Sequence, residues 1–188
     1  MFSNIEIFTF SCITILYFLL PAYLSNSSAL AFGGGTPLDF GKTTKNGVRL
    51  IGDGVTWRGL IAGTIIGMIV GAIQGYFGPY FITNFGEYIF TPILTNVSQG
   101  IIVGFLLGFG ALIGDAIGSF IKRRIGLGRG KPAPILDQID FLIVALLFAS
   151  IVIKIDLYFL IIAILLTLII HLIANSCAYL LGLKDVWY

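Results

Sequence analysis

The chain has 188 residues, a formal net charge of +2 and only 11% charged residues, whereas 57% of its residues are hydrophobic and the mean hydropathy is +1.01. This composition excludes an ordinary soluble domain and indicates an integral membrane protein. We expect a single all-α domain, residues 1–188, built as a bundle of five transmembrane helices of about 20 residues each. The apolar windows lie at about 5–24, 59–77, 100–121, 135–153 and 157–181.

The first expected helix, 5–24, is interpreted as a span that is kept in the mature protein. Ala29-Leu30-Ala31 resembles a signal-peptide cleavage site, which is the competing interpretation. The segment before the apolar run contains Glu6 and no Lys or Arg, however, and the positive charge follows the run. Signal peptides have the opposite arrangement, so an uncleaved helix is favoured.

The loop expected at 25–58 is rich in Gly, Ser and Thr. Its stretch "GGGTPLDFGKTT" resembles a P-loop, but Gly35 and Gly41 enclose five residues instead of four, and Thr36 stands where glycine is needed. A P-loop NTPase is therefore excluded. Glycine amides together with Lys42 still offer a cradle for phosphates, with an ordinary flexible loop as the alternative.

The connection 78–99 is expected on the opposite side of the membrane. It contains aromatic residues, which are typical of the interfacial belt and favour a structural role. They are Tyr80, Phe81, Phe85, Tyr88 and Phe90, with Glu87 as the only charge.

Asp115 lies inside the apolar helix 100–121, about 10 Å from its end at 1.5 Å per residue. A carboxylate at this depth must be paired, protonated or bound to a cation. Ser119, Lys122 and Arg123 follow on the same helical face. The stripe leads from an acid to two cations; alternatively, the cations only anchor the helix and Asp115 is paired within the bundle.

The loop 122–134 and the start of helix 135–153 add further charged groups. Asp137 and Asp140 in "ILDQIDF" share one side of the first turn, and helix capping explains Asp137 better than Asp140. Carboxylates from two helices, edged by Lys and Arg, suit a magnesium ion that also binds phosphate oxygens. We expect Asp115, Asp137 and Asp140 to be the metal ligands of a nucleotide-phosphate site at the membrane face.

Helix 157–181 carries the polar stripe Thr167, His171 and Asn175, spaced by four residues. A lone membrane histidine more often has a packing role than a catalytic one. We expect His171 and Asn175 to hydrogen-bond to the residues that contact the ligand and so to hold those residues in place.

Positive charge lies almost entirely on one side of the expected spans. Ten of the 11 Lys and Arg residues fall in the loops 25–58 and 122–134 or in the C-terminal tail, and only Lys154 falls on the other side. The positive-inside rule then places the N-terminus outside, and both long loops and the C-terminus in the cytoplasm. The ten are Lys42, Lys45, Arg49, Arg58, Lys122, Arg123, Arg124, Arg129, Lys131 and Lys184.

Six sequence blocks, in order, resemble the CDP-archaeol synthase family, the archaeal CTP-dependent cytidylyltransferases of ether lipids. They are "PAYLSNSS" (21–28), "FGGGTPLDFGK" (32–42), "GDGVTWRG" (52–59), "GDAIGSFIKRR" (114–124), "LDQIDF" (136–141) and "AYLLGLK" (178–184). The fourth and fifth blocks also resemble the signature of bacterial phosphatidate cytidylyltransferases. Those enzymes have a His-Gly-Gly turn where this chain has "KPAPI", so their lipid-headgroup contacts are not carried over.

The resemblance implies a membrane enzyme that transfers CMP from CTP to 2,3-bis-O-geranylgeranylglycerol 1-phosphate with magnesium, giving a CDP-activated lipid and pyrophosphate. It implies metal-binding and catalytic roles for Asp115, Asp137 and Asp140, with Lys122 as a further catalytic group. No nucleic-acid partner is expected. Phosphate contacts are implied for Ser119, Lys122, Arg123 and Arg124, and positions near the nucleotide for Asn26, Lys42, Asp53, Thr56, Trp57 and Arg58. Trp57 would either stack on the cytosine or lie in the membrane interface.

Two alternatives remain open. A small cation or proton transporter would use Asp115, His171 and Asn175 as a path, although nearly all charge lies on one face. A CDP-alcohol phosphotransferase is the rival enzyme, but its aspartates are separated by three residues, whereas two separate Asp137 from Asp140.

Overall fold

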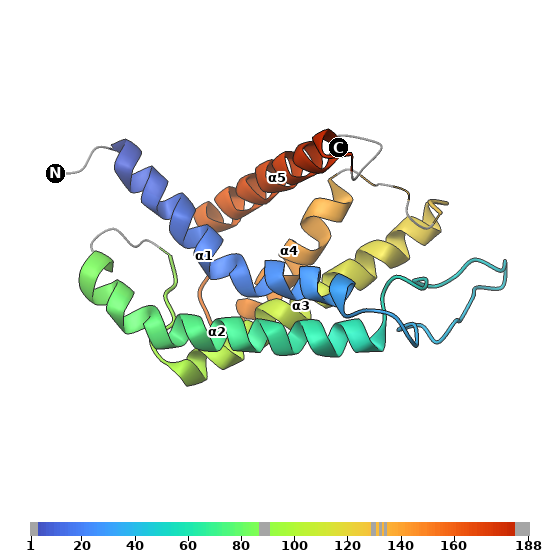
Figure 1. Cartoon of the computed structure of the whole chain (residues 1–188), viewed down its shortest axis with the longest axis horizontal. Helices are drawn as coiled ribbons and strands as arrows, with labels where there is room; N and C mark the ends of the chain where they lie inside the picture. Colours follow the sequence, from blue (N-terminus) through green and yellow to red (C-terminus); the bar gives the residue numbers. More distant parts are fainter. Residues whose placement is uncertain (1–3, 87–90, 129–130, 132, 134, 183–188) are drawn as a thin grey trace.

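The protein is described by a computed structural model that covers residues 4–86, 91–128, 131, 133 and 135–182. Within these ranges the chain forms five α-helices and, apart from two isolated bridges, no β-structure, which confirms the all-α expectation. The helices are α1 (Asn4–Ala31), α2 (Trp57–Phe85), α3 (Val97–Arg124), α4 (Leu136–Ala149) and α5 (Leu157–Leu180). Successive helices run in opposite directions in the view of Figure 1; α1 starts at the left end of the molecule, the loop that follows α1 forms the right end, and α5 ends at the upper middle.

Four of the described helices, α1, α2, α3 and α5, are long and apolar enough to cross a membrane. The 14 residues of α4 span only about 21 Å, less than the roughly 30 Å of a bilayer core. The helix expected over 135–153 is shorter because the chain turns at Ser150 toward Asp156, whose carboxylate caps the first turn of α5 through Phe159 N–H at 2.7 Å. The chain is a multi-pass helical membrane protein.

The first helix extends seven residues beyond its expected C-terminal end, because this polar part of the chain packs against other helices and does not form a loop. Ser25 is fully buried, and its hydroxyl lies against Gly67 of α2 and Gly108 of α3. Ser28 stays helical by donating to Leu24 O at 2.5 Å. The connecting loop is therefore 32–56 instead of 25–58.

The second and third helices also exceed their expected bounds. α2 continues past residue 77 to Phe85, so Tyr80, Phe81 and Phe85 are helical, and Phe81 packs on Tyr17 with ring centroids 5.3 Å apart. Of the aromatic connection expected at 78–99, Glu87, Tyr88 and Phe90 lie outside the described residues, as do Arg129 and Lys184 of the positive set.

Glycines bring α2 and α3 into backbone contact along most of their length. On α2 they recur every four residues and so share one face, which is buried. A Cβ on Gly104 would lie 3.0 Å from the Cα of Gly71 and 3.1 Å from the carbonyl carbon of Gly67. Small residues of this kind are the usual means by which membrane helices approach closely. The facing sets are Gly63, Gly67, Gly71 and Gly75 on α2, and Gly100, Gly104 and Gly108 on α3.

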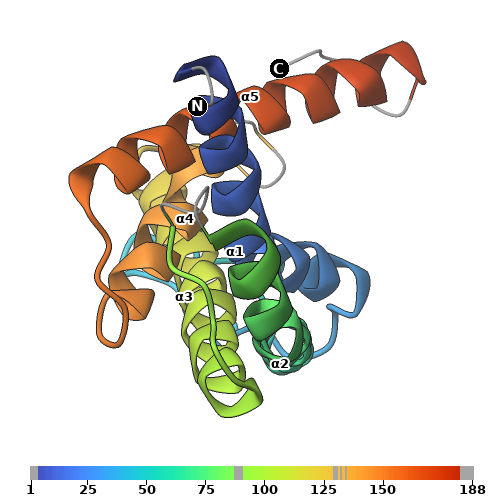
Figure 2. The ribbon, with the colours of Figure 1, turned by 90° about the vertical axis from the view of Figure 1, so that its left-hand side faces the viewer.

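A second glycine face of α3 receives α4. A Cβ on Gly110 would lie 2.8 Å from the Cα of Ala145, and one on Gly114 would lie 2.6 Å from the Cα of Phe141. Helix α3 thus contacts α1, α2 and α4, whereas α5 packs only on α1 and α4 among the described elements. Figure 2 shows α3 inside the bundle and α5 lying across α1 at its edge. The apolar core lies between α1, α3, α4 and α5.

Helix α1 changes direction along its length, which brings its polar end over α2 and α3 (Figure 1). Pro21 lies inside the helix and lacks the amide that would bond to Tyr17 O. Gln74 of α2 replaces that donor, because its side-chain amide donates to Tyr17 O. The bend is therefore stabilised by a contact between two helices.

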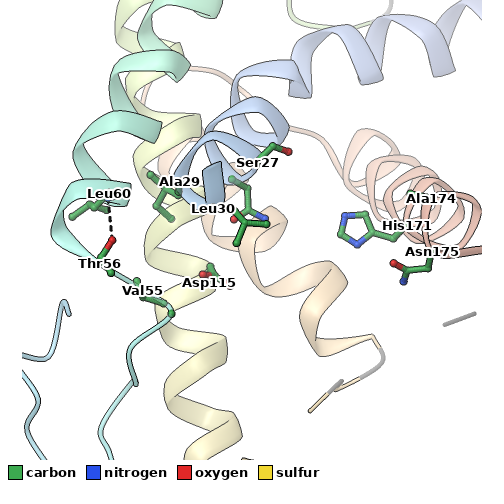
Figure 3. Close-up of a pocket in the computed structure, with 14 residues that line it drawn as sticks. Ser27, Ala29, Leu30, Val55, Thr56, Leu60, Asp115, His171, Ala174 and Asn175 are labelled. Carbon is green, nitrogen blue, oxygen red and sulfur yellow. Dashed lines mark hydrogen bonds between the residues drawn. The ribbon is translucent and has the colours of Figure 1, made fainter. Parts of the chain in front are cut away.

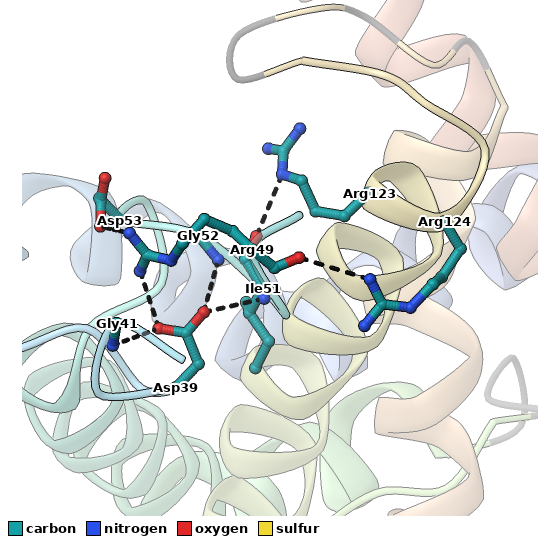
Figure 4. Close-up of polar contacts among 8 residues, drawn as sticks. All are labelled: Asp39, Gly41, Arg49, Ile51, Gly52, Asp53, Arg123 and Arg124. Atoms are coloured by element: carbon teal, nitrogen blue, oxygen red, sulfur yellow. Dashed lines mark hydrogen bonds and ion pairs between the residues drawn. The ribbon is translucent and has the colours of Figure 1, made fainter. Parts of the chain in front are cut away.

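The loop 32–56 is organised around the buried carboxylate of Asp39, which is 6% exposed. Oδ1 accepts from Arg49 Nη2 at 2.8 Å and from Gly41 N–H at 3.0 Å. Oδ2 accepts from the N–H groups of Ile51 at 2.9 Å and Gly52 at 3.1 Å. Figure 4 shows these donors surrounding the carboxylate from both arms of the loop.

Burial alone would raise the pKa of Asp39, but the hydrogen bonds from Arg49 and from three backbone N–H groups lower the pKa far below its ordinary value. A lowered pKa in the folded state means that the carboxylate stabilises the loop above its unfolded pKa of about 4. This contribution is lost as the pH falls from about 4 toward the folded-state pKa.

Gly104→Ala is expected to lower the stability of the protein by about 1 to 3 kcal/mol, because the added methyl group meets backbone atoms of α2 that cannot rotate away. Thermal unfolding in detergent measures the effect. Gly86→Ala is the matched control, since its Cβ would meet only Ile82 at 3.8 Å. Equal melting temperatures for the two variants would contradict backbone contact between α2 and α3.

Asp39→Asn is expected to increase amide hydrogen exchange in the loop 32–56 by about tenfold or more at pH 7, because hydrogen bonds to a charged group each contribute about 1.5 to 3 kcal/mol. The wild-type loop should lose this protection progressively as the pH falls below about 4, and the variant should show no such loss. Asp53→Asn is the control, since Asp53 is exposed and accepts from the other nitrogen of the same guanidinium group, Arg49 Nη1, at 2.6 Å (Figure 4). A loop equally protected in both variants would exclude the role given to Asp39.

Candidate active site

A cavity of about 580 Å³ opens where the end of α1, the loop, the start of α2, α3 and α5 meet. Figure 3 shows Asp115 at its floor, with His171 and Asn175 facing it from α5. Its polar lining includes five of the residues expected at the site, which the chain brings together from four separate segments. They are Asn26, Thr56, Asp115, His171 and Asn175.

Local structure explains two of these positions. Asn26 reaches the cavity because α1 remains helical beyond residue 24. Thr56 is the N-cap of α2, and its hydroxyl accepts from Gly59 N–H at 3.1 Å. The N-cap also fixes the neighbouring loop residues Gly54 and Val55 in the cavity wall.

Asp115 is the only acidic residue among those lining the cavity. It is partly buried on α3, and the interactions acting on it are electrostatic, from Lys122 and Asp137, with no hydrogen bond from a described residue. A carboxylate in this setting favours a cation or a protonated ligand group as its partner.

Asp140 lies directly on α3. A Cβ on Gly118 would overlap its carboxylate, so only glycine leaves room there. Oδ1 accepts from Phe141 N–H at 2.6 Å, whereas Oδ2 is buried and has no hydrogen-bond partner among the described residues. Because Gly118 lies one helical turn from Asp115, the two carboxylates are on the same side of α3, and their charges interact.

Asp137 is already paired. Oδ1 accepts from Lys122 Nζ at 2.7 Å, and Oδ2 accepts from Ala133 N–H at 2.9 Å. The pair joins the end of α3 to the start of α4 and fixes the direction of the Lys122 ammonium group. Lys122 and Asp137 do not line the cavity, but the charges of both act on Asp140.

The three expected metal ligands do not converge on one point. Among the described residues, no three His, Cys, Asp or Glu side chains are placed to hold one metal ion. Asp115 without a hydrogen-bond donor and Asp140 Oδ2 without a partner nevertheless leave two carboxylates with open oxygens on the same side of α3. One or two carboxylates are what magnesium usually takes from a protein when phosphates complete its coordination, so these residues fit that ion.

Arg123 and Arg124, expected to contact phosphate, instead attach the loop to α3. Arg123 Nε donates to Ile51 O at 3.3 Å, and its Nη1 donates to Leu127 O. Arg124 Nη1 donates to Arg49 O at 3.4 Å, and its guanidinium lies 4.3 Å from the centre of the Phe120 ring. Figure 4 shows both arginines reaching the loop from the end of α3.

Two other expected site residues also have contacts within the loop region. Arg58 donates to the carbonyl groups of Phe32 at 2.8 Å and Gly33, and so holds the chain leaving α1. Asp53 accepts from Arg49 Nη1 at 2.6 Å. Neither lines the cavity.

Lys42, Trp57 and Ser119 also lie outside the cavity lining. Lys42 is exposed on the turn after Asp39, and Ser119 is partly buried on α3. Trp57 is 40% exposed and packs on Phe40, with ring centroids 5.8 Å apart. The position of Trp57 favours the interfacial interpretation over cytosine stacking.

In the polar stripe of α5, Thr167 packs inside the protein, whereas His171 and Asn175 line the first cavity. Thr167 is fully buried and hydrogen-bonds to the Tyr23 hydroxyl at 2.7 Å, which joins α5 to α1. His171 stacks on Phe141, with ring centroids 5.7 Å apart and an interplanar angle of 15°. Asn175 lies one turn further along, where the first cavity opens.

A second, more apolar cavity of about 440 Å³ adjoins the first. Leu16, Leu20, Tyr23, Phe141 and Ile170 line only this cavity. Both cavities are lined by Asn26, Ser27, His171 and Ala174, so a polar space and an apolar space share one wall.

The sequence interpretation missed several residues of this region. Asp39 was not given a role, although Asp followed by Phe-Gly in a glycine-rich loop is a turn signal. Tyr23 and Ser27, which are one helical turn apart on α1, also line the second cavity together with the expected Asn26. The sequence did not indicate this, because the polar "SNSS" stretch is typical of a loop and not of a helix.

Comparison with known proteins identifies the family. The family model described as "CarS-like: CDP-archaeol synthase" matches residues 7–188. The chain is 58% identical over 174 residues to the CDP-archaeol synthase of Methanothermobacter thermautotrophicus, covering 93% of this chain and 92% of the relative. It is 50% identical over 173 residues to that of Methanocaldococcus jannaschii, covering 92% and 95%.

A solved structure supports the same assignment. It is described as an intramembrane enzyme for archaeal membrane lipids biosynthesis, superposes with a TM-score of 0.72 at 32% identity, and covers 88% of this chain and 94% of its own. This chain belongs to the CarS-like family of CDP-archaeol synthases.

Proposed function

We propose that the two adjoining cavities carry the reaction of CTP with the isoprenoid ether-lipid phosphate 2,3-bis-O-geranylgeranylglycerol 1-phosphate, which yields a CDP-activated lipid and pyrophosphate. The observation that carries this proposal is the shared wall between a polar cavity containing Asp115 and an apolar cavity among α1, α4 and α5. Such a pair suits one substrate that arrives from water and another that stays in the membrane. The shared residues then lie where the two substrates meet.

We place the polar cavity on the cytoplasmic side of the cell membrane. Among the described residues, eight of the nine Lys and Arg side chains are in or beside the two loops next to this cavity, and Lys154 alone is at the other end of the helices. The eight are Lys42, Lys45, Arg49, Arg58, Lys122, Arg123, Arg124 and Lys131. The positive-inside rule then supports an external N-terminus. In this arrangement α4, despite its length, returns the chain across the membrane, so that α3 and α5 both end on the cytoplasmic side.

Magnesium is the cofactor that we propose for this site. Asp115 and Asp140 would hold it, because both leave carboxylate oxygens without hydrogen-bond donors from the described residues. When bound, it supplies charge neutralisation and a template for the nucleotide phosphates. Asp137 contributes by fixing Lys122, whose ammonium group is aimed at the same region of charge.

In this transfer of CMP, the protein contributes mainly by positioning the substrates and by stabilising charge. A lipid phosphate oxygen attacks the α-phosphorus of CTP, the bond to the β-phosphate oxygen breaks, and pyrophosphate leaves. A phosphate monoester is already ionised near neutral pH, so no residue has to act as a general base. We assign Lys122 to the developing charge on phosphate oxygens, and Asn26, Ser27 and His171 to holding the lipid phosphate at the shared wall.

Asp115→Asn and Asp140→Asn are each expected to lower CDP-lipid formation by about 100-fold or more, since each removes a charge that holds the metal and phosphates. The assay measures radiolabelled CMP transfer from CTP to the lipid phosphate in detergent, over a magnesium titration. Weakened magnesium dependence should accompany the loss. Glu6→Gln is the control, because Glu6 is exposed near the start of α1, far from the cavity. Near-normal activity in both aspartate variants would refute the assigned site.

Leu16→Trp is expected to raise the KM for the lipid phosphate several-fold while leaving the KM for CTP nearly unchanged, because the larger ring occupies the apolar cavity only. Ile13→Trp is the matched control, since Ile13 lies on the same helix, is 57% exposed and lines neither cavity. A rise in the KM for CTP, or the same change in both variants, would contradict the division of the cavities between the substrates.

A further inference from the structure

Phe40 has a backbone conformation that bulky residues rarely adopt. Its φ is 52°, in the left-handed region, and its side chain is 63% exposed. The turn that imposes this conformation is fixed from inside: Phe40 N–H donates to Pro37 O at 3.0 Å, and Gly41 N–H donates to Asp39 Oδ1 at 3.0 Å. Since Asp39 is buried, the turn directs the next side chain outward.

The outward ring is not isolated. Leu38 N–H donates to Val55 O at 2.9 Å, and Trp57 N–H donates to Thr36 O at 3.1 Å, so the two arms of the loop lie side by side. This pairing places Phe40 on Trp57, with ring centroids 5.8 Å apart and planes inclined by 40°. Two large, exposed aromatic rings therefore meet at the first residue of α2.

Trp57 begins the outward face of α2. Exposed apolar side chains recur every four residues along this face, opposite the glycines that pack on α3. In a helix that spans a membrane, such a face contacts lipid, and a tryptophan at its end is typical of the headgroup region. The stripe consists of Trp57, Ile61, Ile65, Ile69, Ile73 and Phe77.

We propose that Phe40 and Trp57 form a membrane anchor that holds the loop 32–56 in the headgroup region of the surrounding bilayer. Phe40 extends the lipid-facing stripe of α2 beyond the end of the helix. The exposed Lys42, two residues on, suits the phosphate groups at the same depth. The strained turn at Phe40 is compatible with this role, because strain of this kind persists where a conformation is needed.

The anchor is connected to the polar cavity by the loop 32–56, which carries Phe40 and also forms part of the cavity wall. Gly54, Val55 and Thr56 line the polar cavity, and Val55 is hydrogen-bonded to the arm that carries Phe40. A loop held at the membrane surface therefore keeps that wall of the cavity at a fixed depth. The competing occupant of the aromatic pair is a nucleobase, which is disfavoured because neither ring lines either of the two cavities described above.

Depth-dependent fluorescence quenching tests the proposal. The sequence contains two tryptophans, Trp57 and Trp187, so the triple variant Phe40→Trp, Trp57→Phe, Trp187→Phe reports only on position 40. The full chain is reconstituted in phosphatidylcholine vesicles containing lipid brominated either near the headgroup or deep in the acyl chain. The matched control replaces Phe40→Trp with Val48→Trp, since Val48 is an exposed apolar residue elsewhere in the loop.

Position 40 should be quenched at least twofold more by shallow than by deep bromine, and position 48 should be quenched mainly by aqueous acrylamide. Equal quenching profiles at the two positions would overturn the proposal. Quenching of position 40 by CTP, without quenching by brominated lipid, would also overturn it and assign the pair to the nucleobase. The experiment needs no turnover, so its outcome is separate from that of the proposed reaction.

Discussion

The close contact of α3 with its neighbours is the constraint on which the remaining structure depends. In a membrane, helices gain little from burying apolar surface against one another, so close packing and polar contacts must hold them together. Glycines at 67, 71, 100 and 104 let the backbones of α2 and α3 touch, and Gly110 and Gly114 do the same for α3 and α4. This contact brings the start of α4, with its two aspartates, to the charged end of α3. The site geometry is thus a consequence of residues that have no side chain.

The charged groups at this end of the molecule have separate physical roles. Asp39, Arg123 and Arg124 have their charges satisfied by the loop, and Asp137 is satisfied by Lys122. Among the described residues, Asp115 receives no hydrogen bond, and Asp140 receives one at Oδ1 from Phe141 N–H but none at Oδ2. Asp39, Arg123, Arg124 and Asp137 therefore have structural contacts, whereas Asp115 and Asp140 have oxygens that remain open to a ligand. A polar cavity bounded by a rigid, hydrogen-bonded loop is suited to catalysis by positioning.

The sequence predicted the helix count and the family, because hydropathy and motif order are local signals. It did not predict the extent of α1, since "SNSS" is typical of a loop and only burial of Ser25 between glycines keeps it helical. It did not predict that Arg58, Arg123 and Arg124 donate to loop carbonyl groups, because spacing alone does not identify a partner in a distant loop. Such partners depend on how the loop folds back, and periodicity contains no information about that.

Asp140 has a buried carboxylate oxygen, Oδ2, with no hydrogen-bond partner among the described residues. A buried acceptor without a partner costs about 1 to 3 kcal/mol, and a charged one costs more, so chains rarely keep one without a use. Here the orphaned oxygen lies against Gly118, where any side chain would overlap the carboxylate. The glycine thus provides the room that the unpaired carboxylate occupies, one turn from the equally open Asp115. The magnesium ion proposed above would offset this cost when held by Asp115 and Asp140, which is a simple physical reason for the two open carboxylates to occur at the same place.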